Sequence, residues 1–308
     1  MPAYTLAVIG CGTMGVAILS GVLDSQRSLQ QAAAASMASS VSSLPDSSAG
    51  DDLTELPTRY IATVNRVESV RRLKKTFSAY PDIAITSGQN VAAAKDADVV
   101  LLGCKPQMVQ DILAEPGMKE ALDGKMVISI CAGLRIDQIV AWVTDKTKVV
   151  RAMPNTPCKI REGMTILTPL PSSLPTAEVD RNILLSIFSA VGRCRFLDEK
   201  HFDACTALAG SGPAFACVFL EAMADGGVMM GLPRQEALEL AAQTMQGAAR
   251  MVMQSGMHPA AIKDSVTTPG GCTIAGLLNL EDGKVRSTVA RTIQAAAEHA
   301  SGLGQNKK

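Results

Sequence analysis

Short apolar runs alternate with longer amphipathic segments through the first half of the chain. The runs lie at 4–9, 60–64, 83–86, 98–103, 125–130 and 148–153, and each has the length of a buried strand. Strands that alternate with helical segments form parallel sheets covered on both faces. The pattern therefore predicts an α/β fold that begins with a Rossmann-type, doubly wound parallel sheet.

The strand pattern fades after about residue 168. The rest of the chain reads as helical segments separated by glycine and proline, which predicts an all-α second domain. We therefore expect a Rossmann domain at 1–168 and a helical domain at 169–308. Within the first domain, residues 25–58 are rich in Ala, Ser and Asp and poor in large apolar residues. They are interpreted as a partly ordered, low-complexity insertion without chemistry.

One predicted helix of the second domain, around 214–220, is apolar on every side. Such a helix must be enclosed, and one small helical domain can hardly enclose it. A partner subunit is the simpler explanation, with burial inside the chain as the alternative. The apolar stretch 213–230 carries Glu221 and Asp225, which argues against a membrane span.

Composition narrows the function classes. The 308 residues are 47% hydrophobic and 19% charged with a formal net charge of zero, typical of a soluble protein, and no basic patch suggests a nucleic-acid partner. Eight cysteines lack a CxxC pair and three histidines are dispersed, so we expect reduced thiols and no metal site. An apolar strand from about Thr5 leaves no room for a targeting segment, which predicts a cytoplasmic protein.

A glycine-rich turn follows the first predicted strand. It reads Gly10-Cys11-Gly12-Thr13-Met14-Gly15 and opens a helical segment that we expect to end near Asp24. Gly10 suits the tight turn, Gly12 lets a pyrophosphate approach the backbone, and Gly15 allows close packing of helix on strand. The motif alone is weak, but its place after an N-terminal strand predicts dinucleotide binding.

The end of the second strand bears on the choice of dinucleotide. An NAD-type fold places an acid there for the ribose hydroxyls, whereas this chain has Asn65 and Arg66. A guanidinium suits a 2′-phosphate, so NADP(H) is favoured and NAD(H) is the second choice. The alternative is that Arg66 is a solvated residue opening the next helix.

A second glycine loop lies far down the chain, within 263–273. Pro269 and the pair Gly270-Gly271 break any helix arriving from His258, and Thr273 is expected at the N-cap of the next helix. Backbone N–H groups of such a loop favour a small anion such as a carboxylate. An ordinary tight turn between helices is the alternative.

Residues 258–281, which contain this loop, resemble almost position by position the signature of the pyrroline-5-carboxylate reductases. The segments 104–107, 130–133 and 151–157 also resemble that family's cofactor loops. The resemblance covers nearly all of the chain except the insertion, with two departures: Cys272 replaces a smaller residue and Asp198 replaces Glu. It implies a homodimer of interleaved helical domains, often assembled further.

The resemblance also implies roles for individual residues. The nicotinamide and its ribose would be bordered by Gly103, Cys104, Lys105, Pro106, Cys131 and Ala132, with Asn90 on the adenosine side. The substrate would be bound by Val266, Gly270, Gly271, Cys272 and Thr273. The Thr273 hydroxyl would hydrogen-bond the ring nitrogen.

The predicted function is reduction of 1-pyrroline-5-carboxylate to L-proline with NADPH. A protonated imine is already electrophilic, so hydride transfer mainly needs positioning and charge placement. A β-hydroxyacid dehydrogenase is one alternative, but it should carry a helical Lys with a downstream Asn that is not found here. A nonenzymatic NADP sensor is another, but it would lose the anion loop that this chain keeps.

Overall fold

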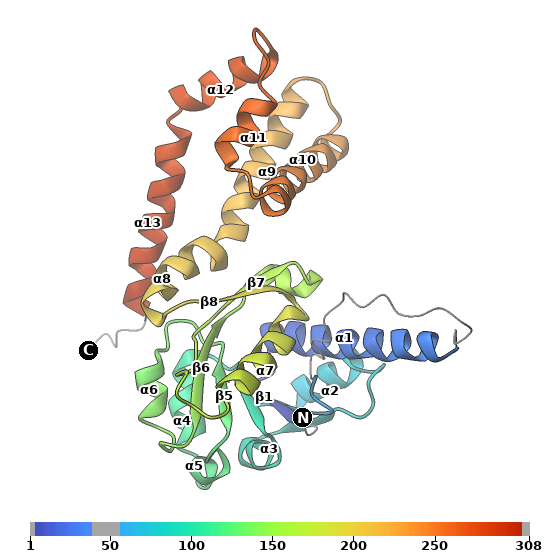
Figure 1. The fold of residues 1–308 in the computed structure, drawn as a ribbon, viewed down its shortest axis with the longest axis vertical. Helices are drawn as coiled ribbons and strands as arrows, with labels where there is room; N and C mark the ends of the chain where they lie inside the picture. The colour runs from blue at the N-terminus through green and yellow to red at the C-terminus, as the bar shows by residue number, and fades with distance from the viewer. Residues whose placement is uncertain (1–3, 39–55, 304–308) are drawn as a thin grey trace. The chain divides into compact units, whose positions relative to one another are not determined.

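The computed structural model describes residues 4–38 and 56–303, which belong to two compact units. Unit 1 is formed by Met1–Thr206 together with His299–Lys308, and unit 2 by Ala207–Glu298. Figure 1 shows the strands in unit 1 and a group of helices in unit 2. Each unit is described by itself below.

Unit 1 is built on one sheet of eight strands. They are β1 (Thr5–Ile9), β2 (Arg59–Val64), β3 (Ala84–Ser87), β4 (Val99–Leu102), β5 (Met126–Ser129), β6 (Lys148–Met153), β7 (Gly163–Leu167) and β8 (Gly192–Phe196). Their order is β3-β2-β1-β4-β5-β6-β7-β8, with β1 to β6 parallel. The first six strands have the Rossmann order. Each of the six predicted runs is confirmed to within one residue at either end.

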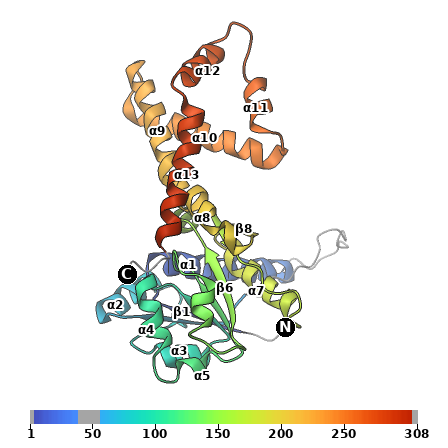
Figure 2. The same cartoon turned by 90° about the vertical axis from the view of Figure 1, so that its left-hand side faces the viewer.

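Helices cover both faces of this sheet (Figures 1 and 2). They are α1 (Thr13–Ala38), α2 (Val67–Thr76), α3 (Asn90–Asp96), η1 (Pro106–Met108), α4 (Val109–Leu113), α5 (Met118–Ala121), α6 (Ile136–Val140), η2 (Thr156–Ile160), α7 (Ala177–Ser189), η3 (Glu199–His201) and α8 (Phe202–Cys205). Alternate strand residues enter two separate cores, one with α1, α2 and α7 and the other with α3 to α6. This is the doubly wound arrangement that the sequence predicted.

Two strands were not predicted. β7 runs antiparallel to β6, and β8 runs parallel to β7. The sequence did not predict β8 because it is an edge strand. Cys194 is buried, but its neighbours Arg193 and Arg195 are exposed, so the strand has no continuous apolar run. Leu184, Ile187 and Phe188 of α7 complete the core that contains α1. Unit 1 therefore extends past residue 168, where we had expected the domain boundary, to Thr206.

The helix after the glycine turn is longer than predicted. We expected it to end near Asp24, but α1 continues to Ala38. The reason is composition: the Gln- and Ala-rich stretch 30–35 has high helix propensity. The first part of the predicted insertion is thus helical. Residues 39–55 of the insertion lie outside the described residues, and residues 56–58 lead into β2.

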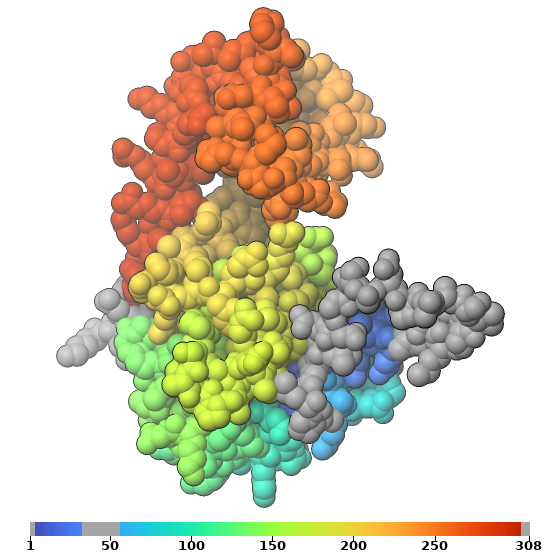
Figure 3. All heavy atoms as spheres, in the orientation of Figure 1, coloured from blue at the N-terminus to red at the C-terminus, as the bar shows by residue number. Residues whose placement is uncertain are grey.

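Unit 2 contains only helices in its described residues. They are the π-helical turn η4 (Thr206–Gly210), which begins at the last residue of unit 1, and α9 (Gly212–Met229), α10 (Arg234–Ser255), α11 (Pro259–Ser265), α12 (Cys272–Asp282) and α13 (Val285–Leu303), which ends in unit 1. The space-filling view draws these helices in yellow, orange and red (Figure 3). α9 and α10 pack through small side chains, with Ala224, Ala237 and Ala241 buried. The all-α second unit matches the prediction.

The apolar helix α9 is not enclosed by the other helices of unit 2. Ala224 is its one buried residue, and Met229 and Met230 at its end are 82% and 80% exposed. Burial of α9 within unit 2 is therefore excluded. The run Glu199–Met229 is long and apolar enough to cross a membrane by length and composition, but it carries Glu221 and Asp225. An exposed apolar surface of this kind marks an interaction site.

Candidate cofactor and substrate sites

The glycine turn after β1 has the geometry its sequence predicted. Gly10 has φ +75°, and its N–H and that of Cys11 donate to the Thr63 carbonyl at 3.1 and 2.9 Å. A Cβ placed on Gly15 would lie 3.0 Å from Cγ1 of Val8, so glycine lets α1 approach the sheet. A Cβ on Gly12 would meet only the Gly10 carbonyl, at 3.8 Å. The backbone at Gly12 is therefore open to a ligand, at the N-terminus of the 26-residue helix α1.

A cavity of about 330 Å³ lies beside this turn, at the carboxyl ends of the strands. It brings together four of the predicted cofactor residues: Gly10, Asn65, Asn90 and Cys104. The sequence did not single out the other side chains on its wall, which include Met108, Asp111, Ile112 and Glu115. These four lie on η1, on α4 and just after it, where no motif marked them.

Hydrogen bonds fix the amide of Asn90 in this cavity. Thr63 Oγ1 donates to Asn90 Oδ1, and Asn90 Nδ2 donates to Glu115 Oε1, both at 2.8 Å. The buried Thr63 thus holds the glycine turn through its carbonyl and Asn90 through its hydroxyl. One Asn90 N–H remains for a ligand acceptor.

Asn65 and Arg66 lie in the turn between β2 and α2, and both are exposed. Arg66 is the N-cap residue of α2 and makes no side-chain cap bond. Within residues 4–38 and 56–303 its guanidinium has no ion-pair partner. It is therefore available to an anion, although it also opens a helix, as the alternative reading held.

The loops after β4 and β5 meet through two cysteines. Cys131 Sγ donates to the carbonyls of Cys104 and Leu102 at 3.3 and 3.5 Å. The hydrogen bond with Cys131 and burial both raise the pKa of the Cys104 thiol, so this group is neutral at physiological pH. Lys105 and Ala132, in the same two loops, are exposed. Gly103 and Pro106 flank Cys104 and Lys105.

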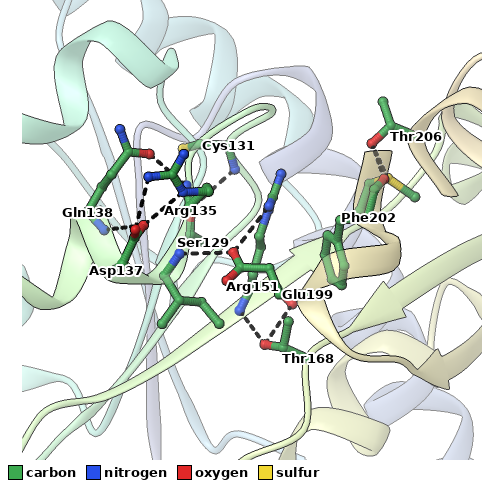
Figure 4. Close-up of polar contacts among 12 residues, drawn as sticks. Ser129, Cys131, Arg135, Asp137, Gln138, Arg151, Thr168, Glu199, Phe202 and Thr206 are labelled. Carbon is green, nitrogen blue, oxygen red and sulfur yellow. Dashed lines mark hydrogen bonds and ion pairs between the residues drawn. The ribbon is translucent and has the colours of Figure 1, made fainter. Parts of the chain in front are cut away.

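A charge pair between a buried arginine and a half-buried glutamate, which the sequence did not predict, lies next to these loops (Figure 4). Arg151 of β6 is 5% exposed, and its Nη1 lies 3.1 Å from Oε1 of Glu199. The guanidinium carbon also lies 4.8 Å from the centre of the Phe202 ring. The sequence marks Arg151 only as the first residue of a segment that resembles a family loop, and nothing in the sequence links it to Glu199.

The second glycine loop lies in unit 2. Gly271 N–H donates to the Thr268 carbonyl at 3.1 Å, Pro269 follows Thr268, and Gly270 has φ +68°. Proline and a positive-φ glycine at these places are typical of a type II turn. A Cβ on Gly271 would lie 2.5 Å from Thr268 Oγ1, so the Thr268 side chain would have to move for any other residue there.

The N-cap predicted for this loop was wrong by two residues. Gly271, not Thr273, is the N-cap residue of α12, and Thr273 is the second residue of the helix. Gly271 has the extended backbone of an N-cap because the turn ends there. Thr273 is half-buried, and among the described residues its hydroxyl has no hydrogen-bond partner. The hydroxyl and the first N–H groups of α12 are thus free for a ligand.

The predicted residues therefore fall into two sets. The cofactor set, Gly10 to Gly15, Asn65, Arg66, Asn90, Gly103 to Pro106, Cys131 and Ala132, lies in the loops at one edge of the sheet of unit 1. The substrate set, Val266 and Gly270 to Thr273, lies in unit 2. A larger cavity, of about 820 Å³, borders the amino ends of β2 and β3 and contains no residue of either set.

Comparison with known proteins gives one consistent result. Residues 199–303 match the family model described as pyrroline-5-carboxylate reductase dimerisation, and residues 5–133 match that of coenzyme F420-dependent NADP oxidoreductases. The chain is 48% identical to a pyrroline-5-carboxylate reductase of Lophium arboricola, over 98% of this chain and 93% of that protein.

Solved structures agree with this. A pyrroline-5-carboxylate reductase from Coxiella burnetii superposes with a TM-score of 0.79 at 27% identity, covering 99% of this chain and 100% of the other. A pyrroline carboxylate reductase from Plasmodium falciparum, crystallised with NADP bound, gives a TM-score of 0.74 at 27% identity with the same coverage. The similarity thus extends over both units.

Proposed function

The chain belongs to the pyrroline-5-carboxylate reductase family, and from this premise we propose that it reduces 1-pyrroline-5-carboxylate to L-proline with NADPH, the final step of proline biosynthesis. The observation that carries the proposal is that one chain contains both an open dinucleotide turn at Gly12 and an anion loop with a free Thr273 hydroxyl. A nonenzymatic NADP sensor would not need the second feature.

The residues of unit 1 fit NADP(H). The backbone at Gly12 has room for a pyrophosphate at the start of α1, and the exposed Arg66 suits the 2′-phosphate. Asn90, held by Thr63 and Glu115, offers an N–H on the adenosine side. Gly103 to Pro106 and Cys131-Ala132 would border the nicotinamide ribose. When bound, NADPH supplies the hydride; NADH is the secondary donor.

The loop of unit 2 would hold the imine. The N–H groups at the start of α12 and the dipole of that helix favour the carboxylate of the substrate. The Thr273 hydroxyl would hydrogen-bond the ring nitrogen, with Val266, Gly270, Gly271 and Cys272 around the ring. The imine is electrophilic once protonated, and no acid or base side chain is required of the loop, since solvent supplies the proton.

The match to the dimerisation family supports a homo-oligomer. We propose a homodimer, assembled further or not, in which the partner covers the exposed apolar face of α9. Large exposed side chains of unit 2 support this, among them Phe219, Met223, Met229 and Leu278. We also propose that unit 1 is the NADP-binding domain and unit 2 the substrate-binding domain, and that the enzyme is cytoplasmic, which its eight free cysteines support.

A direct assay tests the proposal. Purified enzyme is given 1-pyrroline-5-carboxylate with NADPH or NADH, and proline and cofactor oxidation are measured together. We expect stoichiometric proline, faster with NADPH. Oxidation of a β-hydroxyacid in place of imine reduction would favour the dehydrogenase alternative, and NADPH binding without turnover of either substrate would favour the sensor.

A further inference from the structure

One carboxylate, that of Glu199, joins three segments of unit 1 that are far apart in the sequence. Its Oε1 accepts a hydrogen bond from the Ile136 N–H at 2.9 Å and lies 3.1 Å from Nη1 of Arg151. Ile136 is the first residue of α6, Arg151 lies in β6, and Glu199 begins η3. Figure 4 shows the Arg151 and Glu199 side chains pointing toward one another.

The arginine is held on every side. Its side chain is 7% exposed, against 29% for that of Glu199. Its backbone N–H donates to Thr168 Oγ1 at 2.9 Å, and its guanidinium lies over the Phe202 ring. The buried guanidinium thus lies between the Phe202 ring and the Glu199 carboxylate, which it holds by an ion pair.

Stability alone does not explain a charge pair in this place. Two charges taken out of water lose hydration that their attraction barely offsets, so a buried pair adds little net stability, while removing one partner leaves an uncompensated buried charge. What the pair does supply is geometry. It sets the distance between β6 and the first turn of α6.

That geometry reaches the cofactor loop. The five residues before Ile136 are Cys131 to Arg135, the loop after β5. Ser129 of β5 is paired with Arg151 in the sheet, and its Oγ accepts from the Cys131 N–H at 3.3 Å. Ser129 thus fixes the beginning of the loop, and Glu199 fixes its end.

The same pair lies where the chain passes between the units. Unit 1 ends at Thr206 and resumes at His299. A cavity of about 360 Å³ is lined by Gly133 and Arg135 of the loop, by Arg151 and Glu199, and by Ser301 from the returning segment. Loop, ion pair and both connecting segments are therefore neighbours within unit 1.

We propose that Glu199 is a positioning residue for hydride transfer: by accepting the Ile136 N–H, it holds the Cys131-Ala132 loop in the place that the nicotinamide requires. The proposal rests on the proposed function. Glu199 contacts neither substrate nor cofactor in it and acts through the loop.

The test uses two double variants that leave no buried charge. Arg151→Met with Glu199→Gln keeps a carbonyl oxygen for the Ile136 N–H, whereas Arg151→Met with Glu199→Met has the same length and no such oxygen. We expect the Gln double variant to keep kcat within about threefold and the Met double variant to lose on the order of tenfold to a hundredfold, as for a small misplacement of reacting groups. The deuterium isotope effect with C4-deuterated NADPH should rise in the Met double variant only.

A control removes another ion pair from the same strand. Lys148 Nζ lies 2.7 Å from Asp180 Oδ2 at the amino end of β6, away from the loops. Lys148→Met with Asp180→Asn should change the melting temperature without changing kcat. Glu199→Asp, which keeps the charge but is too short to reach both partners, serves if the Met double variant does not fold; it too should lower kcat.

Wild-type kcat in the Met double variant, or in Glu199→Asp, would overturn the proposal and leave Glu199 a structural residue. Equal losses in the Gln and Met double variants would also overturn it, because the Ile136 hydrogen bond would not matter. If the wild-type enzyme makes no proline, the proposed function fails by itself. The dissociation constants of NADPH for the two double variants then still test whether Glu199 positions the loop. Equal dissociation constants in the Gln and Met double variants would show that it does not.

Discussion

Gly10 and Cys104 are in direct contact: a Cβ placed on Gly10 would lie 2.6 Å from the Cβ of Cys104. Real side chains do not approach so closely, and Gly10 also has φ +75°, so no other residue fits there without strain. The turn after β1 and the loop after β4 therefore pack together. Both residues line the 330 Å³ cavity, and their contact builds one wall of it.

Gly12, two residues on, has open space where Gly10 has none. Gly12→Val should therefore leave the fold intact and block NADPH, because the valine side chain would occupy the space of the pyrophosphate. Calorimetry should detect no NADPH binding to this variant. Its melting temperature should stay close to that of the wild type. Gly10→Ala is the matched control and should lower the melting temperature. Unchanged NADPH affinity in Gly12→Val would remove the glycine turn from the cofactor site.

Arg66 is predicted to make the enzyme bind NADPH more tightly than NADH. Arg66→Ala should weaken NADPH by about 1–3 kcal/mol, the cost of a lost charge-assisted bond to the 2′-phosphate, and leave NADH almost unchanged. Arg71→Ala is the control, since Arg71 is exposed on the same helix α2. Dissociation constants for both cofactors decide the matter. Equal losses for NADPH and NADH would make Arg66 a solvated helix-opening residue.

The sequence predicted most of unit 1 because its strands are buried on both faces. Residues 99–102 and 126–128 are apolar without interruption, and strands of that kind can be recognised without an alternation of apolar and polar residues. β8 is the contrary case, since Arg193 and Arg195 on its exposed side hide the strand. The extension of α1 to Ala38 was not predicted because residues 30–35 have high helix propensity but few large apolar side chains to give a helical pattern.

The two sites differ in how far a sequence could predict them. The roles of Gly10 and Gly15 were predicted correctly because each depends on its immediate surroundings. Gly10 has a positive φ, and Gly15 packs too close to Val8 for a side chain. Glu115 and Glu199 could not be found, since each acts through a partner distant in sequence, Asn90 or Arg151. The N-cap was misplaced at Thr273 because threonine is a common cap, whereas the turn itself makes Gly271 the cap.

Cys11 makes stability depend on pH. Burial raises the pKa of its thiol from the ordinary 9.0 to about 12, an effect that Arg72 opposes only in part. In the unfolded chain the thiol has its ordinary pKa, so it loses its proton at a lower pH than in the folded protein. The contribution of this thiol to the free energy of unfolding is therefore fully present below pH 9 and is lost as pH rises toward 12. The free energy of unfolding should fall by about 1.4 kcal/mol per pH unit more steeply in the wild type than in Cys11→Ala. Urea unfolding of both proteins across this range checks it; parallel slopes would contradict it.

Thr273 and Thr267 lie in one loop and should behave in opposite ways. The Thr267 hydroxyl donates to the Lys263 carbonyl at 2.7 Å, whereas the Thr273 hydroxyl has no partner among the described residues. Thr273→Val keeps the shape and the backbone N–H groups and deletes one hydrogen bond to the imine nitrogen. Turnover should fall by about ten- to a hundredfold, or 1–3 kcal/mol, with NADPH affinity unchanged because the predicted cofactor residues belong to unit 1.

Thr267→Val should do the reverse, costing about 1 kcal/mol of stability through the lost hydrogen bond while turnover stays near the wild type. Measuring melting temperature and kcat on both variants separates a catalytic hydroxyl from a structural one. Because Gly271 already caps α12, helix capping cannot account for a loss of turnover in Thr273→Val. A destabilised Thr273→Val enzyme with wild-type kcat would show that the hydroxyl does not touch the imine, and the carboxylate-binding N–H groups would then have to orient the substrate alone.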